Sequence, residues 1–300
     1  MMKAIMYHYV RKHQAAFPHL KYLHFDDFTK QLDFFEKHDG FVSQEDFFRA
    51  LRTGTSVPGV ILSFDDGLKD HYQYVYPELS RRGLWGIFYV PIFPFLKNKL
   101  LDVHRIHLLL AAHGGDTVIN LVRQNIARDM LADEDIADFQ KKAYAHHNDK
   151  DTNIEVKRIL NYYIKPEHRT SILNCLMDEL FGDELSLVQN FYASIDQIQE
   201  MSRAGMLIGS HAIHHVVMSK LSENEQKREI YDSFAYLSQK LGITAPRTFC
   251  YPYGHPYTFT QTTMDLLASV GCMFAFETDP RDITDNDLST RPLALPRYDC

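Results

Sequence analysis

The chain has 300 residues, of which 45% are hydrophobic and 13% aromatic, so it can bury a large core within one α/β barrel. Its formal net charge of −7, without a run of lysine and arginine, argues against a nucleic-acid partner. No stretch approaches the roughly 18 apolar residues of a membrane span, and the first residues lack the apolar run and cleavage site of a signal peptide, so we expect a cytoplasmic protein without a membrane span.

Short apolar strands alternate with amphipathic helices over the outer thirds of the chain. The helix pattern at 43–54 begins with the Ser43–Asp46 spacing of a capping box and ends at a glycine, and the pattern at 222–242 does the same. Such alternation predicts a parallel sheet covered by helices; seven strands favour a barrel, although an open doubly wound sheet would give much the same pattern. The predicted strands are residues 4–10, 59–64, 85–90, 206–210, 247–252, 273–277 and 292–296.

The middle third of the chain breaks this alternation. Residues 93–190 show helical periodicity and no convincing strand. We therefore predict a helical insertion between the third and fourth strands of a barrel that is formed by residues 1–92 and 191–300.

Side chains that can bind metals follow three of the predicted strands directly. Because the loops after the strands of a βα barrel meet at one end, these side chains should lie close together. The segments are Asp65-Asp66-Gly67 after strand 59–64, His211 to His215 after strand 206–210, and Tyr253-Gly254-His255 after strand 247–252.

A carboxylate with two imidazoles, leaving positions open for water, is a common set of ligands for a divalent metal. In such a site one member of the Asp65–Asp66 pair could bind the metal, while the other stays free as a base. Each motif alone has an ordinary explanation, because Asp-Asp-Gly is usually a turn and two histidines four residues apart often lie on a solvated helix face. Their joint position after predicted strands favours a functional site.

The motifs resemble those of a known family, the polysaccharide deacetylases with a NodB-homology domain (carbohydrate esterase family 4). SFDDG at 63–67 is similar to the family's T/S-F-D-D-G, and SHAIHH at 210–215 is similar to its S/N-H-T-x-x-H segment. YPYG at 251–254 resembles the motif that carries the oxyanion site, and MYHYV at 6–10 resembles the M-Y-H that often opens such chains. The resemblance implies a distorted (β/α)7 barrel.

The resemblance also implies a role for each matching residue. Asp65 would be the general base, and Tyr253 would supply a backbone N–H to the tetrahedral oxyanion. Asp66, His211 and His215 would hold one divalent metal ion, which we expect to be zinc.

Two departures from the family pattern stand out. Many members have an arginine where this chain has Cys250, so the arginine that usually holds the base is expected to be missing. The family's late Leu-x-x-His, the source of the general acid, has no match, because no histidine follows His255. His255 is therefore our candidate for the acid. His8, at the end of the first strand, could also face the site, and His214 is an alternative ligand to His215.

These features predict a metal-dependent deacetylase that hydrolyses an N-acyl group, in the first place N-acetyl, on a sugar of a surface-polysaccharide pathway. The expected substrate is a nucleotide-linked or lipid-linked sugar or an oligosaccharide. Two alternatives stay open: a catalytically impaired carbohydrate-binding barrel, and the same hydrolase acting on a non-sugar amide or an ester.

Overall fold

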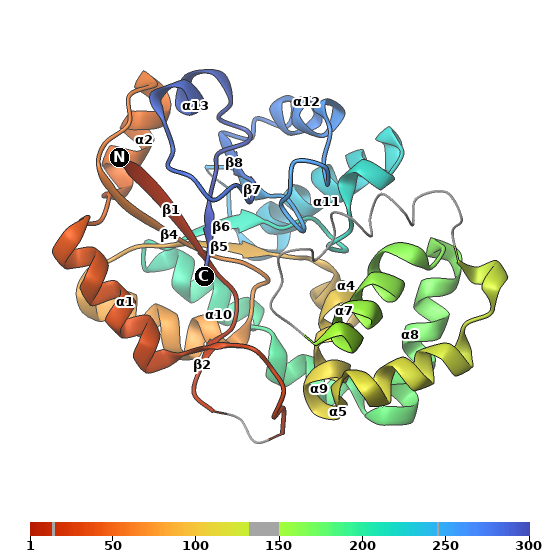
Figure 1. Ribbon diagram of the computed structural model, residues 1–300. Coiled ribbons are helices and arrows are strands. Elements are labelled where there is room, and N and C mark those ends of the chain that lie inside the picture. Colours follow the sequence, from red (N-terminus) through yellow and green to blue (C-terminus); the bar gives the residue numbers. More distant parts are fainter. Residues whose placement is uncertain (14–15, 132–149, 245) are drawn as a thin grey trace. The chain divides into compact units, whose positions relative to one another are not determined.

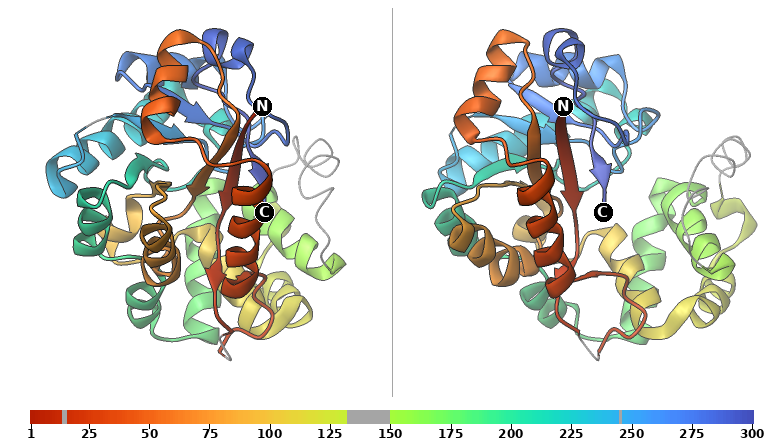
Figure 2. Two further views of the ribbon diagram at one scale, coloured as in Figure 1. Left: turned by 90° about the vertical axis from the view of Figure 1, so that its left-hand side faces the viewer. Right: turned by 60° about the vertical axis from the view of Figure 1, so that its left-hand side comes forward.

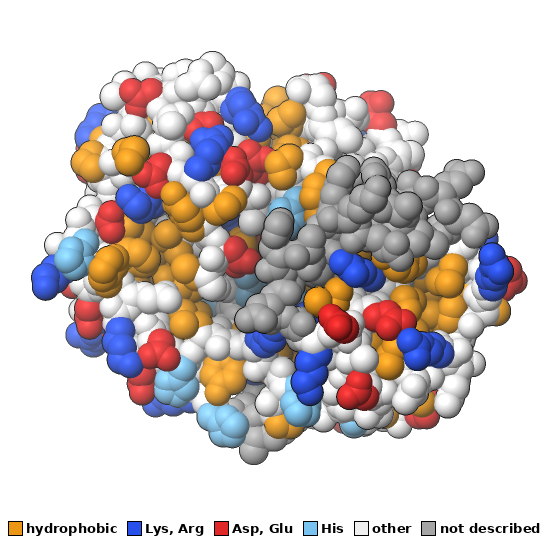
Figure 3. All heavy atoms as spheres, viewed as in Figure 1, with side chains coloured by type: hydrophobic (Ala, Val, Ile, Leu, Met, Phe, Trp, Pro, Cys, Tyr) orange, Lys and Arg blue, Asp and Glu red, His pale blue; other side chains and the backbone are white. Residues whose placement is uncertain are grey.

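The computed structural model describes residues 1–13, 16–131, 150–244 and 246–300, which form two compact units. None of the described helices is both long enough and apolar enough to cross a membrane. Acidic and basic side chains are interspersed over the face shown in Figure 3, where the described residues form no continuous basic area. The first unit comprises residues 1–12, 22–98 and 189–300, and the second comprises residues 13–21 and 99–188.

A seven-stranded sheet forms the centre of the first unit, with the strand order β8-β7-β6-β5-β4-β1-β9 (Figure 1). All neighbouring strands pair in parallel. A separate two-stranded sheet pairs β2 (Val10–Arg11) with β3 (Leu23–His24). The strands of the large sheet are β1 (Met2–Tyr7), β4 (Gly59–Phe64), β5 (Ile87–Val90), β6 (Leu207–Ser210), β7 (Thr248–Cys250), β8 (Phe274–Phe276) and β9 (Tyr298–Asp299).

The last segment of the chain contacts both edges of this sheet. Leu295 forms a parallel bridge with Phe276 of β8, and Tyr298 pairs with Ile5 of β1. Figure 2 shows β1 beside the C-terminal strand in both views. The predicted fold class, a distorted (β/α)7 barrel, is confirmed. The strand predicted at 292–296 is instead a short β9 farther along, because the prolines at both ends of the predicted segment have no N–H for a ladder.

The helices of the first unit begin and end largely where the sequence predicts. Ser43 caps α2, and Ser222 with Glu225 forms the capping box of α11. α2 and α11 both end at a glycine in the left-handed conformation. The helices are α1 (Phe25–His38), α2 (Gln44–Thr53), the π-helix η1 (His71–Val75), α3 (Tyr76–Arg82), α4 (Phe93–Lys97), α10 (Ile195–Arg203), η4 (Met218–Lys220), α11 (Glu223–Leu241), α12 (Gln261–Ser269) and α13 (Asp285–Thr290).

Stacked aromatic rings tie the central strands together. Phe64 of β4 stacks on Tyr7 of β1, with ring centroids 5.5 Å apart, and on Phe88 of β5, with centroids 4.8 Å apart. All residues of β4 are buried. The next residue after β4 is Asp65, so this packing fixes the position from which the candidate site begins.

The second unit is helical where the structure describes it. Its described residues contain no strand. Buried Arg105 forms a bidentate ion pair with Glu184 that joins two of its helices, with Nη2 and Oε2 2.7 Å apart.

Part of the predicted insertion, residues 132–149, lies outside the described residues. The domain boundaries predicted after residues 92 and 190 stay a prediction. The helices after β5 and before β6 that involve this unit are α5 (Asp102–Asn125), η2 (Arg128–Met130), α7 (Asp151–Arg158), η3 (Ile159–Tyr163), α8 (Pro166–Leu180) and α9 (Glu184–Phe191).

Candidate active site

The carboxyl ends of neighbouring parallel strands bring the predicted site residues together. Asp65 and Asp66 directly follow β4, and His211 directly follows β6. Cys250 is the last residue of β7, which pairs with β6. All four side chains are buried although they are polar, which is the arrangement expected of a functional cluster rather than of a surface turn.

Three buried side chains form a group with the geometry of a metal site. The Asp66 Oδ1 atom lies 3.5 Å from His211 Nε2 and 3.6 Å from His215 Nε2. A tetrahedral site with metal–ligand bonds of about 2.0–2.1 Å would place its ligand atoms about 3.4 Å apart. The residues present therefore fit a divalent metal ion.

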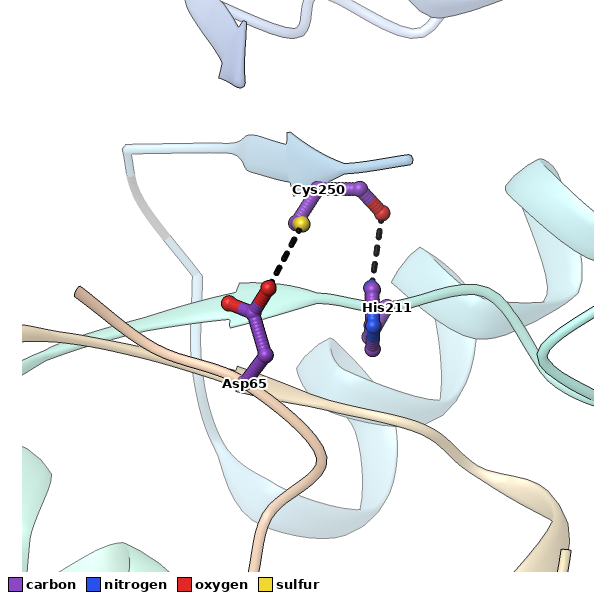
Figure 4. A group of neighbouring side chains, drawn as sticks. All are labelled: Asp65, His211 and Cys250. Atoms are coloured by element: carbon purple, nitrogen blue, oxygen red, sulfur yellow. Dashed lines mark hydrogen bonds between the residues drawn. The ribbon is translucent and has the colours of Figure 1, made fainter. Parts of the chain in front are cut away.

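The tautomer of His211 suits a metal ligand. Its Nδ1 lies 2.8 Å from the carbonyl oxygen of Cys250 (Figure 4). A carbonyl oxygen can only accept, so Nδ1 carries the proton and Nε2 keeps its lone pair on the side of Asp66. Burial lowers the pKa of His211, which also favours the neutral, metal-binding form.

Backbone strain is concentrated in the same loops. Five described residues other than glycine have a positive φ, and four of them are Asp66 (79°), Ala212 (61°), His215 (53°) and Tyr253 (63°). Such conformations cost about 1–3 kcal/mol each and persist only where the surroundings impose them. Two of the strained residues are candidate ligands, so the strain accompanies the geometry that the site requires.

The loop with Tyr253 packs closely against the site and the next strand. The Tyr253 ring lies 5.0 Å from the His215 ring, measured between centroids. Gly254 has φ 69°, and a Cβ atom there would lie 2.2 Å from the hydroxyl oxygen of Thr278. Only glycine fits at this position, which fixes the backbone of the residue that was predicted to face the oxyanion.

The expectation that no arginine holds the base is wrong. Arg297, which lies two residues after the Leu295 bridge, donates from Nη1 to Asp65 Oδ1 (3.0 Å) and from Nη2 to Asp65 Oδ2 (2.8 Å). Its Nη2 also donates to the Cys250 sulfur at 2.8 Å, and the Cys250 thiol donates to Asp65 Oδ2 at 3.2 Å. Figure 4 shows the thiol pointing at Asp65. An arginine does hold Asp65, and it comes from position 297 instead of position 250.

This ion pair bears on the charge of Asp65. Burial is the largest single influence and raises the pKa of Asp65, but the charge and hydrogen bonds of Arg297, together with the charges of His211 and His8, hold the pKa below its usual range. Asp65 is therefore an ionised carboxylate. Burial raises the pKa of the Cys250 thiol, so it stays protonated and can donate its hydrogen to Asp65.

A second group of potential ligands shares His211 and adds Asp65 and Cys250. The guanidinium of Arg297 lies within hydrogen-bonding distance of both Asp65 oxygens and of the Cys250 sulfur. A cation bound there would have to displace this positive charge. The geometry therefore favours Asp66, rather than Asp65, as the carboxylate ligand.

The other candidate histidines lie in different surroundings. The His214 Nδ1 pairs with Glu229 at 2.5 Å, and its side chain is half exposed. His255 is exposed, and its ring stacks on Tyr257. His8 follows β1 directly beside Asp65, because Tyr7 and Phe64 are register partners.

Sequence reasoning missed Arg297, although one signal pointed to it. Arg297 follows the predicted strand 292–296 as directly as Asp65 follows its own strand. A charged residue at that end of a buried strand belongs among the site candidates by the same rule.

Residues 180–275, which include His211, His215 and Tyr253, match the family model described as polysaccharide deacetylase. No curated protein sequence gives a match.

The solved structures that resemble the chain include deacetylases. One is the Streptococcus pyogenes deacetylase PplD in complex with acetate, with 16% identity and a TM-score of 0.60 over 100% of this chain and 92% of that chain. Another is IcaB from Ammonifex degensii, with 18% identity and a TM-score of 0.56 over 100% and 91%. A third is the deacetylase domain of BpsB from Bordetella bronchiseptica, with 13% identity and a TM-score of 0.54 over 99% and 95%. Residues 180–275 therefore match a model of the family that the motifs predict, and the similar solved structures share the predicted fold.

Replacement of Arg297 by methionine should destabilise the protein. It leaves the Asp65 carboxylate buried without its cation, which typically costs roughly 3–5 kcal/mol. The ion pair contributes stability above the pKa of an unfolded aspartate, about 3.9, and this contribution is lost as the pH falls towards the lower folded value. The difference between wild type and Arg297→Met in denaturant-unfolding free energy should therefore be large at pH 7 and shrink below pH ~4.

The control is Arg123→Met, which breaks an exposed ion pair with Glu155. Such a pair contributes about 0–1 kcal/mol. Equal small losses in both variants would contradict the assigned role of Arg297.

Proposed function

Because its motifs and fold are those of polysaccharide deacetylases, we propose that this protein removes an N-acyl group, in the first place N-acetyl, from a sugar. One observation carries the proposal: a buried group of Asp66, His211 and His215 lies beside a carboxylate, Asp65, that Arg297 keeps ionised. We propose zinc as the metal, because two imidazoles and one carboxylate with an open position are typical of catalytic zinc sites.

A bound divalent metal would lower the pKa of a water molecule and polarise the acyl carbonyl group. Asp65 would accept a proton from the attacking water, since its carboxylate is ionised and next to the ligand group. The backbone N–H of Tyr253 would donate to the developing oxyanion. Arg297 would keep Asp65 in one orientation, because both carboxylate oxygens accept from the same planar guanidinium.

Arg297 also bears on the alternative of a catalytically impaired barrel. A barrel that only binds sugars has no need of an ionised carboxylate, whose burial is costly unless it is paired. The bidentate pair therefore favours an active hydrolase. It does not distinguish a sugar amide from a non-sugar amide or an ester.

The substrate is proposed to be an N-acetylated sugar of a surface-polysaccharide pathway, either nucleotide-linked, lipid-linked or an oligosaccharide. Acetate, the product of deacetylation, is the molecule bound to the similar structure of PplD. The cytoplasmic location stays a prediction.

A histidine other than His255 could donate the proton to the leaving amine. His8 follows β1 at the same end of the sheet as Asp65, and its charge is one of those that lower the pKa of Asp65. Its backbone is anchored, because His71 Nε2 donates to the His8 carbonyl oxygen at 2.8 Å. Burial lowers the pKa of His71 to about 4, so His71 is a neutral donor that fixes His8 without competing for protons. We therefore propose His8 as the donor beside the sequence-based candidate, His255.

Removal of the ligands should remove the metal. The double variant His211→Ala/His215→Ala should lose bound zinc, and Asp66→Ala should bind it at least tenfold more weakly, because too few protein ligands remain. Elemental analysis of purified protein measures the stoichiometry, and a chelator should abolish acetate release from N-acetylated sugars in the wild type. A wild-type metal content in the double variant would refute the site.

Replacement of Asp65 by asparagine should separate metal binding from turnover. The variant should keep its metal, because Asp65 pairs with Arg297, yet lose about 10²–10⁴-fold in kcat through the missing general base. Metal analysis and acetate release are measured on the same preparation. If the metal is lost while activity persists, the roles of Asp65 and Asp66 are reversed.

The pH–rate profile should identify the proton donor. A general acid must be protonated, so activity falls as the pH rises above its pKa. The matched variants His8→Gln and His255→Gln are compared with wild type; the variant that removes the donor should lose the alkaline limb of the kcat profile and much of kcat. We expect this of His8→Gln. Unchanged profiles in both variants would exclude both histidines.

A further inference from the structure

The loop that carries both candidate imidazole ligands is held by one buried carboxylate. Glu229 of α11 is 7% exposed, and its Oε2 accepts hydrogen bonds from the backbone N–H groups of Ile213 and His214, both at 2.9 Å. Its other oxygen, Oε1, lies 2.5 Å from Nδ1 of His214. Three donors from two consecutive residues thus converge on one carboxylate between His211 and His215.

A second contact from the same helix face holds the beginning of this loop. The N–H of Ala212 donates to the Ser210 hydroxyl oxygen at 3.2 Å, and the Ser210 and Ser233 hydroxyl groups are 2.7 Å apart. Ser233 lies four residues after Glu229, so both side chains project from the same face of α11. The helix therefore holds the loop at its first residues and at its middle.

The loop needs such support because its backbone is strained. Ala212 and His215 flank the two residues that donate to Glu229, and both have positive φ values. A non-glycine residue in this conformation returns to a more favourable one unless its surroundings prevent it. A shift of either residue would move an imidazole away from Asp66, whose Oδ1 lies 3.5–3.6 Å from the two Nε2 atoms.

We propose that Glu229 is a positioning residue of the metal site, which sets metal affinity by holding the His211–His215 loop in its strained, ligand-ready conformation. The inference rests on the proposed function, in which His211 and His215 bind the metal. The hydrogen bonds of Glu229 go to Ile213 and His214, which are not the proposed ligands, so its effect passes through the backbone.

The experiment measures zinc affinity of the full chain by competition with a chromophoric chelator, and the visible absorption of the cobalt-substituted protein. Glu229→Leu, which removes all three acceptor contacts, should weaken zinc binding by about 10–100-fold and change the cobalt spectrum. Glu229→Gln keeps an oxygen that can accept from the two backbone N–H groups, so its loss should be much smaller. Glu229→Asp draws the carboxylate back by one methylene and should lie between them.

The matched control is Gln226→Leu, on the same helix one turn earlier. Gln226 is buried and bonds to Leu221 and Thr263, away from the ligand loop. Its replacement should lower the melting temperature but leave zinc affinity and the cobalt spectrum unchanged. If Glu229→Leu does not fold, the zinc affinities of Glu229→Gln and Glu229→Asp are compared with that of the control instead.

The inference would be overturned if Glu229→Leu, or Glu229→Asp where the Leu variant does not fold, kept wild-type zinc affinity. It would also be overturned if Gln226→Leu lost as much zinc affinity as Glu229→Leu. These results leave the proposed function standing if His211→Ala/His215→Ala loses zinc. Wild-type zinc binding in that double variant would instead overturn both the metal site and the role of Glu229.

Discussion

The buried ion pair between Arg297 and Asp65 is the interaction on which the site depends. Two adjacent carboxylates, 2% and 3% exposed, would repel each other and would each lose hydration worth several kcal/mol. Arg297 neutralises Asp65 through two hydrogen bonds, while Asp66 faces two imidazoles. The surroundings of the two carboxylates therefore differ in the way that their proposed roles require, a base for Asp65 and a metal ligand for Asp66.

The position of Arg297 in turn depends on closure of the sheet. The segment that carries it meets β8 at Leu295 and β1 at Tyr298, so the guanidinium lies between the two edges of the barrel. Asp65 directly follows β4, whereas Arg297 directly precedes β9. The geometry of this ion pair therefore depends on the whole curled sheet and not on any single motif.

Local patterns in the sequence were enough to predict most of the barrel but not this closure. The strand at 59–64 was placed correctly because an uninterrupted apolar run stops at two carboxylates, and the helix that begins after Ser222 because a capping box is a local signal. The proximity of Asp66, His211 and His215 was predictable from the rule that strand ends converge. The Arg297–Asp65 contact spans 232 residues, and the contact of Glu229 with the ligand loop depends on how a helix packs on a strand end. The position of Arg297 after the predicted strand 292–296 makes it a site candidate, but no local pattern predicts its pairing with Asp65 or the contact of Glu229 with the loop.

Cys250 leaves room for the Arg297 guanidinium beside Asp65. Its small side chain is fully buried, and its sulfur both donates to Asp65 and accepts from Arg297. A long side chain at this position would occupy the space that the Arg297 guanidinium fills, and an arginine would add a second positive charge against it. To be held as the proposed base, Asp65 needs two N–H donors in a fork, one for each carboxylate oxygen. This geometry fixes where the guanidinium must lie, but not which part of the chain supplies it, and here Arg297 does so from the segment before β9.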